Sequence, residues 1–195
     1  MTKRFWATLL SLATFGFVLV MASCADQNPV GSMLNIEQPD AIHYTRSFDA
    51  DYAKIIAGEV PDFTERYNSA IIDQNGGSLY VSGNMLLVPR GAVSGPTKFE
   101  IQLAPDGSIG AELTATAVGS DVRNDVGHAG FRRPLTLIFT YAYANNVPDQ
   151  PELMRVAWRK DDGTLEVQPS YVDTHHKMVY GQIYHFTPYI VIAPS

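Results

Sequence analysis

The chain has a single cysteine, Cys24, among its 195 residues. One thiol cannot form an internal disulfide, so no such bond stabilises the folded part. A domain without disulfides must gain its stability from the burial of apolar side chains. Apolar residues make up 46% of the sequence, which is enough for a sizeable core. The single cysteine therefore requires a role other than internal cross-linking.

Positive charge is also scarce in this sequence. It contains 14 Lys and Arg against 20 Asp and Glu, a net charge of −6 with His neutral. Nucleic-acid-binding domains carry a basic patch, and polybasic segments bind anionic lipid. We therefore expect no nucleic-acid partner and no polybasic contact with a membrane surface.

Sequence motifs for catalysis and for cofactors are missing as well. We find no Gly-x-Ser-x-Gly elbow, no phosphate-binding loop and no pair of carboxylates arranged for acid–base chemistry. Asp121, Asn124 and Asp125 do not follow the spacing of a calcium-binding EF-hand loop, and we interpret them as a solvated loop. We expect no metal, no other cofactor and no enzymatic activity.

Two adjacent histidines, His175 and His176, lie close to Asp173 in the sequence and could suggest a metal site. Neighbouring residues of a strand point to opposite faces, so both imidazoles could not easily bind one ion. We therefore interpret this stretch as a hairpin loop between Val172 and Met178.

The N-terminal end has the layout of an export signal. Lys3 and Arg4 precede an uncharged run over residues 5–23, and Met21-Ala22-Ser23 lead directly into Cys24. This pattern resembles a bacterial lipoprotein signal, with Met21 at a position where Leu is usual. The resemblance implies cleavage before Cys24, lipid attached to its side chain, and a location in the bacterial cell envelope facing the periplasm or the exterior. An uncleaved transmembrane helix is the alternative, because the run approaches the ~17–25 residues that span a bilayer.

The composition suggests four segments. Residues 1–23 are the expected signal peptide, 24–40 a flexible lipidated tether, 41–69 an N-terminal extension of unclear structure, and 70–195 the folded domain. Loss of the signal leaves 12 basic and 20 acidic residues, a net charge of −8. Within the extension, residues 49–57 fit either a short helix or a strand.

From residue 70 onward, apolar and polar residues alternate with a period of two. Phe99, Ile101 and Leu103 alternate with polar neighbours, which places one face on a core and the other in solvent. The same alternation recurs over Leu135–Tyr141, Met154–Trp158 and Leu165–Val167. Between these runs lie four expected hairpin turns, at Asn75-Gly76-Gly77, Ser82-Gly83-Asn84, Asp106-Gly107 and Asp161-Asp162-Gly163. The sequence therefore predicts an all-β fold, an antiparallel β-sandwich.

Three stretches resemble a known family. Gly76–Val81, Met85–Val93 and Tyr184–Val191 are similar to the recurring marks of the ZU-five domain, a β-sandwich module of zonula occludens protein, netrin receptors and ankyrins, with bacterial surface and lipoprotein relatives. The resemblance covers about residues 70–193, and it implies protein–protein contact without one fixed activity. Independently of it, the Pro and Gly within Val88–Ala92 predict a structural corner.

The resemblance also implies a possible reaction. Some relatives cleave themselves at a His-Phe-Ser tripeptide, and this chain has His185-Phe186-Thr187. Thr187 would supply the nucleophile and His185 the general base for cleavage between Phe186 and Thr187. Thr replaces the usual Ser, however, and Pro188 restricts Thr187 to extended conformations. We therefore favour a structural role for the tripeptide and keep self-cleavage as the alternative.

Two features indicate binding. A long loop over Gly119–Arg133 contains His128, Arg132 and Arg133, and long loops on a rigid sandwich often bind partners. Trp158, Tyr141, Tyr143, Tyr180 and Tyr184 are expected in strands, most of them in the core, and an exposed row of aromatic side chains would indicate glycan or peptide contact. We expect a membrane-anchored, non-catalytic envelope lipoprotein that binds another envelope protein or a polysaccharide. A carbohydrate-binding accessory domain is a further alternative.

Overall fold

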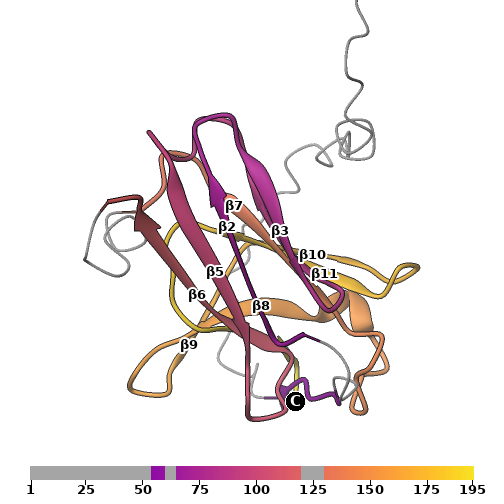
Figure 1. The fold of residues 1–195 in the computed structure, drawn as a ribbon. Coiled ribbons are helices and arrows are strands. Elements are labelled where there is room, and N and C mark those ends of the chain that lie inside the picture. The colour runs from indigo at the N-terminus through magenta and orange to yellow at the C-terminus, as the bar shows by residue number, and fades with distance from the viewer. Residues whose placement is uncertain (1–53, 60–64, 120–129) are drawn as a thin grey trace, which may run out of the picture. The chain divides into compact units, whose positions relative to one another are not determined.

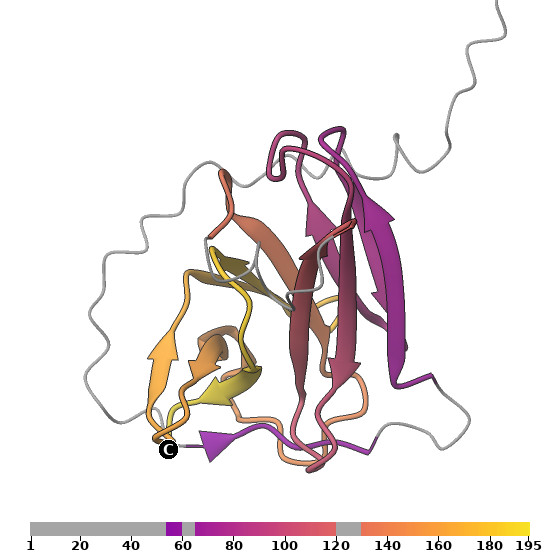
Figure 2. The same ribbon diagram turned by 60° about the vertical axis from the view of Figure 1, so that its left-hand side comes forward.

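The protein folds as two antiparallel β-sheets packed as a sandwich, which confirms the predicted fold class (Figures 1 and 2). The computed structural model describes residues 54–59, 65–119 and 130–195. The elements in these ranges are β1 Lys54–Ile55, β2 Tyr67–Ile72, β3 Gly77–Val81, β4 Asn84–Val88, β5 Thr97–Leu103, β6 Gly110–Ala117, β7 Leu135–Thr140, the 3-10 helix η1 Pro151–Leu153, β8 Arg155–Arg159, β9 Leu165–Val167, β10 Ser170–Asp173, β11 Met178–Ile183 and β12 Tyr189–Ala193.

The two sheets differ in size. The larger sheet has the order β2-β5-β6-β12-β8-β9, with β1 also paired to β12, and the smaller sheet has the order β10-β11-β7-β4-β3. Every pairing in both sheets is antiparallel. Strands that follow one another along the chain often lie in different sheets, so the chain crosses between the layers several times.

The core lies between the sheets and comes from the alternating residues. In β5, Phe99, Ile101 and Leu103 are buried, whereas Lys98 and Gln102 are exposed. The same period of two places alternate residues of β3, β4, β7 and β11 in the main core. The predicted one-sided pattern is therefore confirmed for Phe99–Leu103.

The predicted pattern is wrong for β8, where Val156 and Ala157 are both fully buried although they face opposite sides of the sheet. Leu165 and Val167 of β9 pack against Ala157 and not in the main core.

Strand β12 is buried on both faces. All five of its residues are buried, and Tyr189 and Val191 belong to the main core. Ile190 and Ile192 face the other way and form a second, smaller apolar cluster with Ala157. Since β12 pairs with β1, β6 and β8, it is the central strand of the larger sheet.

Three of the four expected hairpins are confirmed. The two-residue turn between β3 and β4 has positive φ at both Ser82 (45°) and Gly83 (83°), as this tight hairpin requires. Gly107 lies in the turn between β5 and β6, and Gly163 in the turn between β8 and β9.

The expected hairpin at Asn75-Gly76-Gly77 is wrong. Strand β2 pairs with β5 along its whole length, so β3 continues into the other sheet and the turn is a corner between the layers. Gly76 has a φ of 81°, and its amide donates to Asp73 O at 3.0 Å. A positive φ lets the chain reverse its direction. Pairing with strands that are distant in the sequence decides which sheet the next strand joins.

The run Val88–Ala92 forms the predicted corner after β4. Gly91 has a φ of 80°, and its amide donates to Gln74 O at 2.9 Å. The two corners therefore pack against each other, one leading into the smaller sheet and the other leaving it.

The sandwich also includes part of the N-terminal extension. Lys54 and Ile55 form β1, so the strand interpretation holds for these two residues of the 49–57 stretch. Ile56 is fully buried in the main core, and its amide donates to Val191 O at 2.9 Å. The segments expected to be a signal peptide and a tether, and the rest of the extension up to residue 53, lie outside the described residues.

Candidate functional site

A row of five residues crosses the outer face of the smaller sheet, one from each strand. Tyr171 of β10 pairs with Tyr180 of β11, and Tyr180 pairs with Ile138 of β7. Ile138 pairs with Met85 of β4, and Met85 pairs with Tyr80 of β3. The neighbouring residues in each strand face the core, so the period of two turns these five side chains outward. We call these five residues the tyrosine row.

Exposure along the tyrosine row is greatest at its two ends. Tyr80 is 54% exposed and Tyr171 is 40% exposed, whereas Ile138 at the centre is only 3% exposed. The ring centroids of Tyr171 and Tyr180 lie 5.7 Å apart with the planes tilted by 44°. Because adjacent strands lie ~4.8 Å apart, the backbone of the row spans about 19 Å across the sheet.

The residues beside the tyrosine row are mostly uncharged. The next pairs on one side join Ser78 to Leu87 and Thr136 to Gln182, and on the other side Met178 lies between Thr140 and Asp173. Among these outward positions, only Asp173 has an ionisable carboxyl group. The face therefore offers aromatic rings, the apolar side chains of Leu87 and Met178, hydroxyl groups and one amide, with almost no charge.

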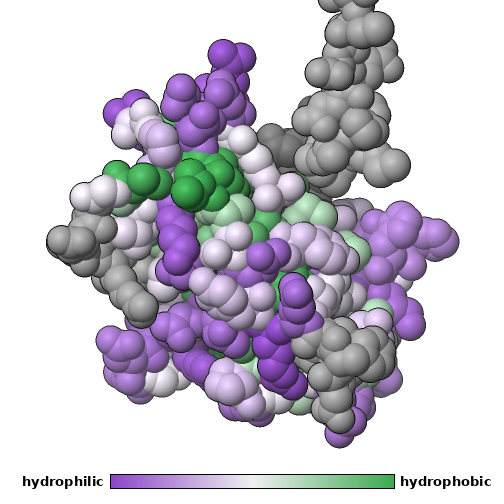
Figure 3. All heavy atoms as spheres, viewed as in Figure 1, coloured by the Kyte–Doolittle hydropathy of each residue, from purple (hydrophilic) through white to green (hydrophobic). Residues whose placement is uncertain are grey.

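The outer face of the larger sheet has a different chemistry. Glu100 accepts hydrogen bonds from Lys98 Nζ at 2.8 Å, Tyr67 Oη at 2.6 Å and Thr114 Oγ1 at 2.9 Å. The bond from Lys98, followed by that from Tyr67, lowers the pKa of Glu100 from 4.5 to about 2. Around Glu100 the polar groups of this face bond to one another, whereas Ile71, which pairs with Lys98 on the same face, is 66% exposed. The side of the molecule in Figure 3 has mainly hydrophilic side chains and a hydrophobic patch above its centre.

The tripeptide His185-Phe186-Thr187 lies in the connection between β11 and β12, outside any strand. This connection crosses from the smaller sheet to the larger one. Phe186 is 2% exposed, and its ring packs edge-on against Phe131 at 4.9 Å and Phe99 at 5.7 Å. The tripeptide thus places an aromatic side chain in the core at the point where the chain changes sheet.

His185 is positioned by two neighbouring aromatic residues. Its ring lies 4.6 Å from that of Trp158, and its Nδ1 lies 3.3 Å from Tyr189 Oη. The Tyr189 hydroxyl also donates to His185 O at 2.9 Å. Burial raises the pKa of Tyr189 from 10 to about 12.

Thr187 Oγ1 is buried and has no hydrogen-bond partner among the described residues. The hydroxyl lies near enough to Tyr189 to offset part of the rise in the pKa of that residue, but the pair does not have hydrogen-bond geometry. Positive φ at residues other than glycine occurs only at Ser82 and Lys177 in the described ranges. The tripeptide therefore shows none of the left-handed backbone strain that could assist cleavage of its peptide bonds.

The expected binding loop is described only at its ends. Arg132 and Arg133 are exposed, and the amide of Arg132 donates to Ala92 O at 3.2 Å. Phe131 anchors this end of the loop, because its ring is buried beside Phe186. His128 lies outside the described residues, as do Asp121, Asn124 and Asp125.

The two adjacent histidines lie in the predicted hairpin loop between β10 and β11. His176 Nδ1 lies 2.6 Å from Asp173 Oδ2, and the amides of His175 and His176 both donate to Asp173 Oδ1 at 3.0 Å. These bonds lower the pKa of Asp173, the amide of His176 having the largest effect. In the described part of the chain, no group of three His, Cys, Asp or Glu could hold a metal ion.

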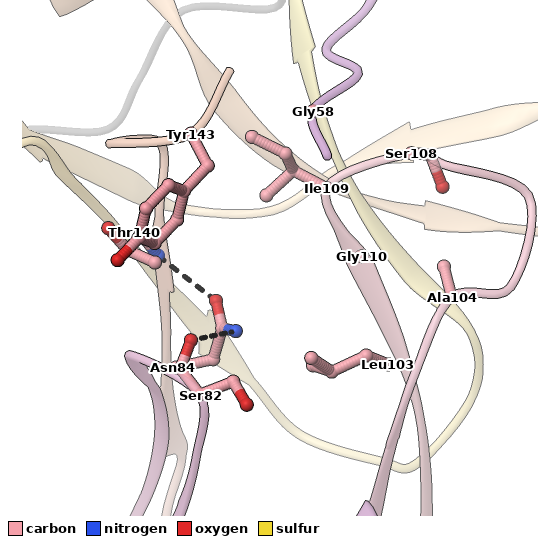
Figure 4. Close-up of a pocket in the computed structure, with 10 residues that line it drawn as sticks. All are labelled: Gly58, Ser82, Asn84, Leu103, Ala104, Ser108, Ile109, Gly110, Thr140 and Tyr143. Carbon is pink, nitrogen blue, oxygen red and sulfur yellow. Dashed lines mark hydrogen bonds between the residues drawn. The ribbon is translucent and has the colours of Figure 1, made fainter. Parts of the chain in front are cut away.

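The hollow drawn in Figure 4 is small. It contains about 30 Å³ of space between the β3–β4 turn, the β5–β6 turn and Tyr143. This is room for about one or two water molecules, whereas ligand pockets usually reach about 300–1,000 Å³. Asn84 in its wall accepts from Thr140 N at 3.1 Å and donates to Ser82 O at 3.2 Å. The hollow is therefore a structural feature of the sheet ends.

The five aromatic residues expected in strands lie partly in strands and partly in connections. Trp158 and Tyr180 lie in strands, as expected. The expectation is wrong for Tyr141, Tyr143 and Tyr184, which lie in connections, and Tyr143 and Tyr184 are about half exposed there. Tyr80 and Tyr171, the most exposed members of the tyrosine row, were not among the residues named. The period of two within each strand predicts that both side chains point outward. The sequence near them does not predict the strand register that places them in one row with Tyr180.

Cys24 and the segment before it lie outside the described residues. No helix in the described ranges is long and apolar enough to cross a membrane. Comparison of the chain with known protein families and with curated proteins finds no match: no family model fits the chain, and no curated relative is detected. The resemblances to the ZU-five domain and to a lipoprotein signal therefore stay predictions from the sequence.

Proposed function

We propose that this chain is a non-catalytic binding module of the bacterial cell envelope, held at the membrane by lipid on Cys24. In this proposal the β-sandwich binds another envelope protein or a polysaccharide through the outer face of its smaller sheet. The tyrosine row is the observation that carries the proposal. Isolated exposed aromatic residues are ordinary, but here aromatic and apolar side chains are contiguous across all five strands.

The chemistry of tyrosine supports a binding role for this face. Its ring contributes apolar contact area at a small entropic cost, and its hydroxyl forms hydrogen bonds at the rim of that contact. Tyr80 and Tyr171, at the two ends of the row, are about half exposed to solvent and are available for such a contact. The rigid sheet holds the side chains in a fixed line, so little ordering is needed on binding.

Photo-crosslinking in living cells tests this proposal. Tyr80 is replaced by p-benzoylphenylalanine in the full-length chain, and Tyr67 in a matched control. Both residues are exposed strand tyrosines, but Tyr67 lies on the outer face of the larger sheet. We expect irradiation to attach a partner at position 80 and none at position 67. Absence of any adduct at position 80, or equal adducts at both positions, contradicts the proposal.

Self-cleavage between Phe186 and Thr187 is a second candidate, favoured by one observation. The Thr187 hydroxyl is buried without a partner among the described residues, two positions from His185. Against it, His185 Nδ1 lies 3.3 Å from Tyr189 Oη, and Phe186 is fixed in the core. The intact mass of the chain extracted from membranes separates the candidates. We expect a lipidated chain that begins at Cys24 and extends beyond Thr187, and a break before Thr187 would establish cleavage.

A further inference from the structure

The distribution of exposed surface along the tyrosine row restricts the kind of partner. Protein–protein interfaces concentrate their binding energy in a central apolar patch that a polar rim shields from water. The tyrosine row has the opposite arrangement, because its centre at Ile138 is already buried and its exposed rings are at the ends. A protein partner would find no central anchor site here, whereas a linear ligand would contact both ends.

The direction of the row suits a linear ligand that crosses the strands. Its members come from all five strands and lie at direct pairing positions, so the line runs at right angles to the strand direction. The row spans about 19 Å, which is longer than a single sugar and comparable with a short oligosaccharide. An extended peptide that used the sheet would instead add to an edge strand by backbone hydrogen bonds.

The composition of the face specifies the chemistry of that ligand. Pyranose rings have faces lined with C–H groups, which pack on aromatic rings, and hydroxyl groups around their edge. Tyr171 and Tyr80 offer exposed rings, and Ser78, Thr136 and Gln182 place hydroxyl and amide groups beside the row. Cationic side chains are missing from these outward positions of β3, β4, β7, β10 and β11, so the strands of this face have no group to pair with an acidic polysaccharide, and Lys177 lies in the turn at their end.

We infer that the tyrosine row binds a neutral pyranose polysaccharide laid across the strands of the smaller sheet, with its sugar rings packed on Tyr171 and Tyr80. The neighbouring hydroxyl and amide groups bond to the sugar hydroxyls. This inference rests on the proposed function, and it selects one of the two partner classes that the proposal allows.

Native affinity electrophoresis of the full-length chain in a non-ionic detergent tests the inference. Gels contain one neutral polysaccharide each (hydroxyethyl cellulose, galactomannan or dextran) or the acidic polysaccharide alginate, and the net negative charge of the chain drives its migration. We expect retardation in at least one neutral gel and none in alginate. Truncation of one ring, in Tyr80→Ala or Tyr171→Ala, should weaken binding about tenfold.

Two further variants give the test its specificity. Tyr184→Ala removes a tyrosine that is 49% exposed but lies in the β11–β12 connection, and it should bind like the unmodified chain. Tyr80→Phe keeps the ring and should retain most of the affinity, and far-UV circular dichroism of each variant checks its fold. Equal retardation of Tyr80→Ala and Tyr184→Ala overturns the inference, as does retardation in alginate but in no neutral gel.

The two experiments separate failure of the inference from failure of the proposed function. No retardation in any neutral gel, together with a protein adduct at position 80, overturns the polysaccharide inference and leaves the binding face established. No retardation together with no adduct at position 80 overturns both.

Discussion

Replacing Gly76 by Ala should destabilise the sandwich strongly, because two separate effects act at that position. Gly76 has a φ of 81°, a left-handed conformation that costs an L-residue about 1–2 kcal/mol. A Cβ there would also lie 2.5 Å from Val88 O and 2.8 Å from Arg90 N. Both are backbone atoms of the corner that follows β4, so neither can rotate away as a flexible side chain could.

Gly107→Ala is a matched control for the first effect alone. Gly107 has a φ of 78°, nearly the same as Gly76, but a Cβ there meets no atom within 4 Å. Gly107→Ala should therefore lower the free energy of unfolding by about 1–2 kcal/mol. Gly76→Ala adds an overpacking cost of about 1–3 kcal/mol, because the corner has to move. The expected difference between the two variants is about 2 kcal/mol.

Urea unfolding of the full-length chain, followed by far-UV circular dichroism, measures that difference. With a slope of about 1–3 kcal/mol per molar urea for a domain of this size, the midpoint of Gly76→Ala should lie about 1 M below that of Gly107→Ala. Equal midpoints would show that a Cβ at position 76, placed against the backbone of the second corner, does not lower the free energy of unfolding. The account of the corner given above would then be wrong.

Three further predictions concern the core, the sheet contact and pH. Phe186→Ala removes a fully buried ring and should cost about 3–5 kcal/mol in urea unfolding, and an unchanged midpoint would contradict its core position. Gly181→Ala sets a Cβ 2.6 Å from Val156 Cβ across the sheets and should cost about 1–3 kcal/mol, whereas Gly95→Ala, with nothing within 4 Å, should not. Glu100 has a lowered pKa, so its bonds stabilise the fold above pH 4.5 and are lost as the pH falls towards about 2. Glu100→Gln should therefore cost about 1 kcal/mol at pH 7 and almost nothing at pH 2, and a cost independent of pH would exclude this origin.

The strands that face solvent on one side were predictable from the sequence. In β5 the buried Phe99 and Ile101 alternate with residues such as the exposed Lys98, because one face of the strand packs on the core and the other faces solvent. Strand β12 gives no such signal, since Tyr189–Ala193 are buried on both sides and form an unbroken apolar run. The expected hairpin at Asn75-Gly76 failed for a related reason, because a turn residue reports local backbone freedom and not the sheet to which the next strand belongs.

The tyrosine row could not be predicted because it depends on register between distant strands. The turn at Ser82-Gly83 fixes how β3 pairs with β4, and that part is local. The pairing of Met85 with Ile138 and of Ile138 with Tyr180 joins segments about fifty residues apart. A shift of one residue in the pairing register would move all the side chains of a strand to the opposite face. The pattern within each strand does not specify its register with the other strands, so it does not predict the row.

The position of β12 sets the order of events when this chain is made. Its residues Tyr189–Ala193 pair with β1, β6 and β8, and β1 lies almost 140 residues earlier in the sequence. Until the ribosome has added Ala193, the larger sheet lacks its central strand, and β6 and β8 have no strand between them to pair with. The larger sheet therefore cannot be completed before Ala193 has been added, and its many distant pairings favour a folding time of about milliseconds to seconds. Until β12 is in place, the edges of β6 and β8 that pair with it present unpaired backbone N–H and C=O groups, to which another chain could bind.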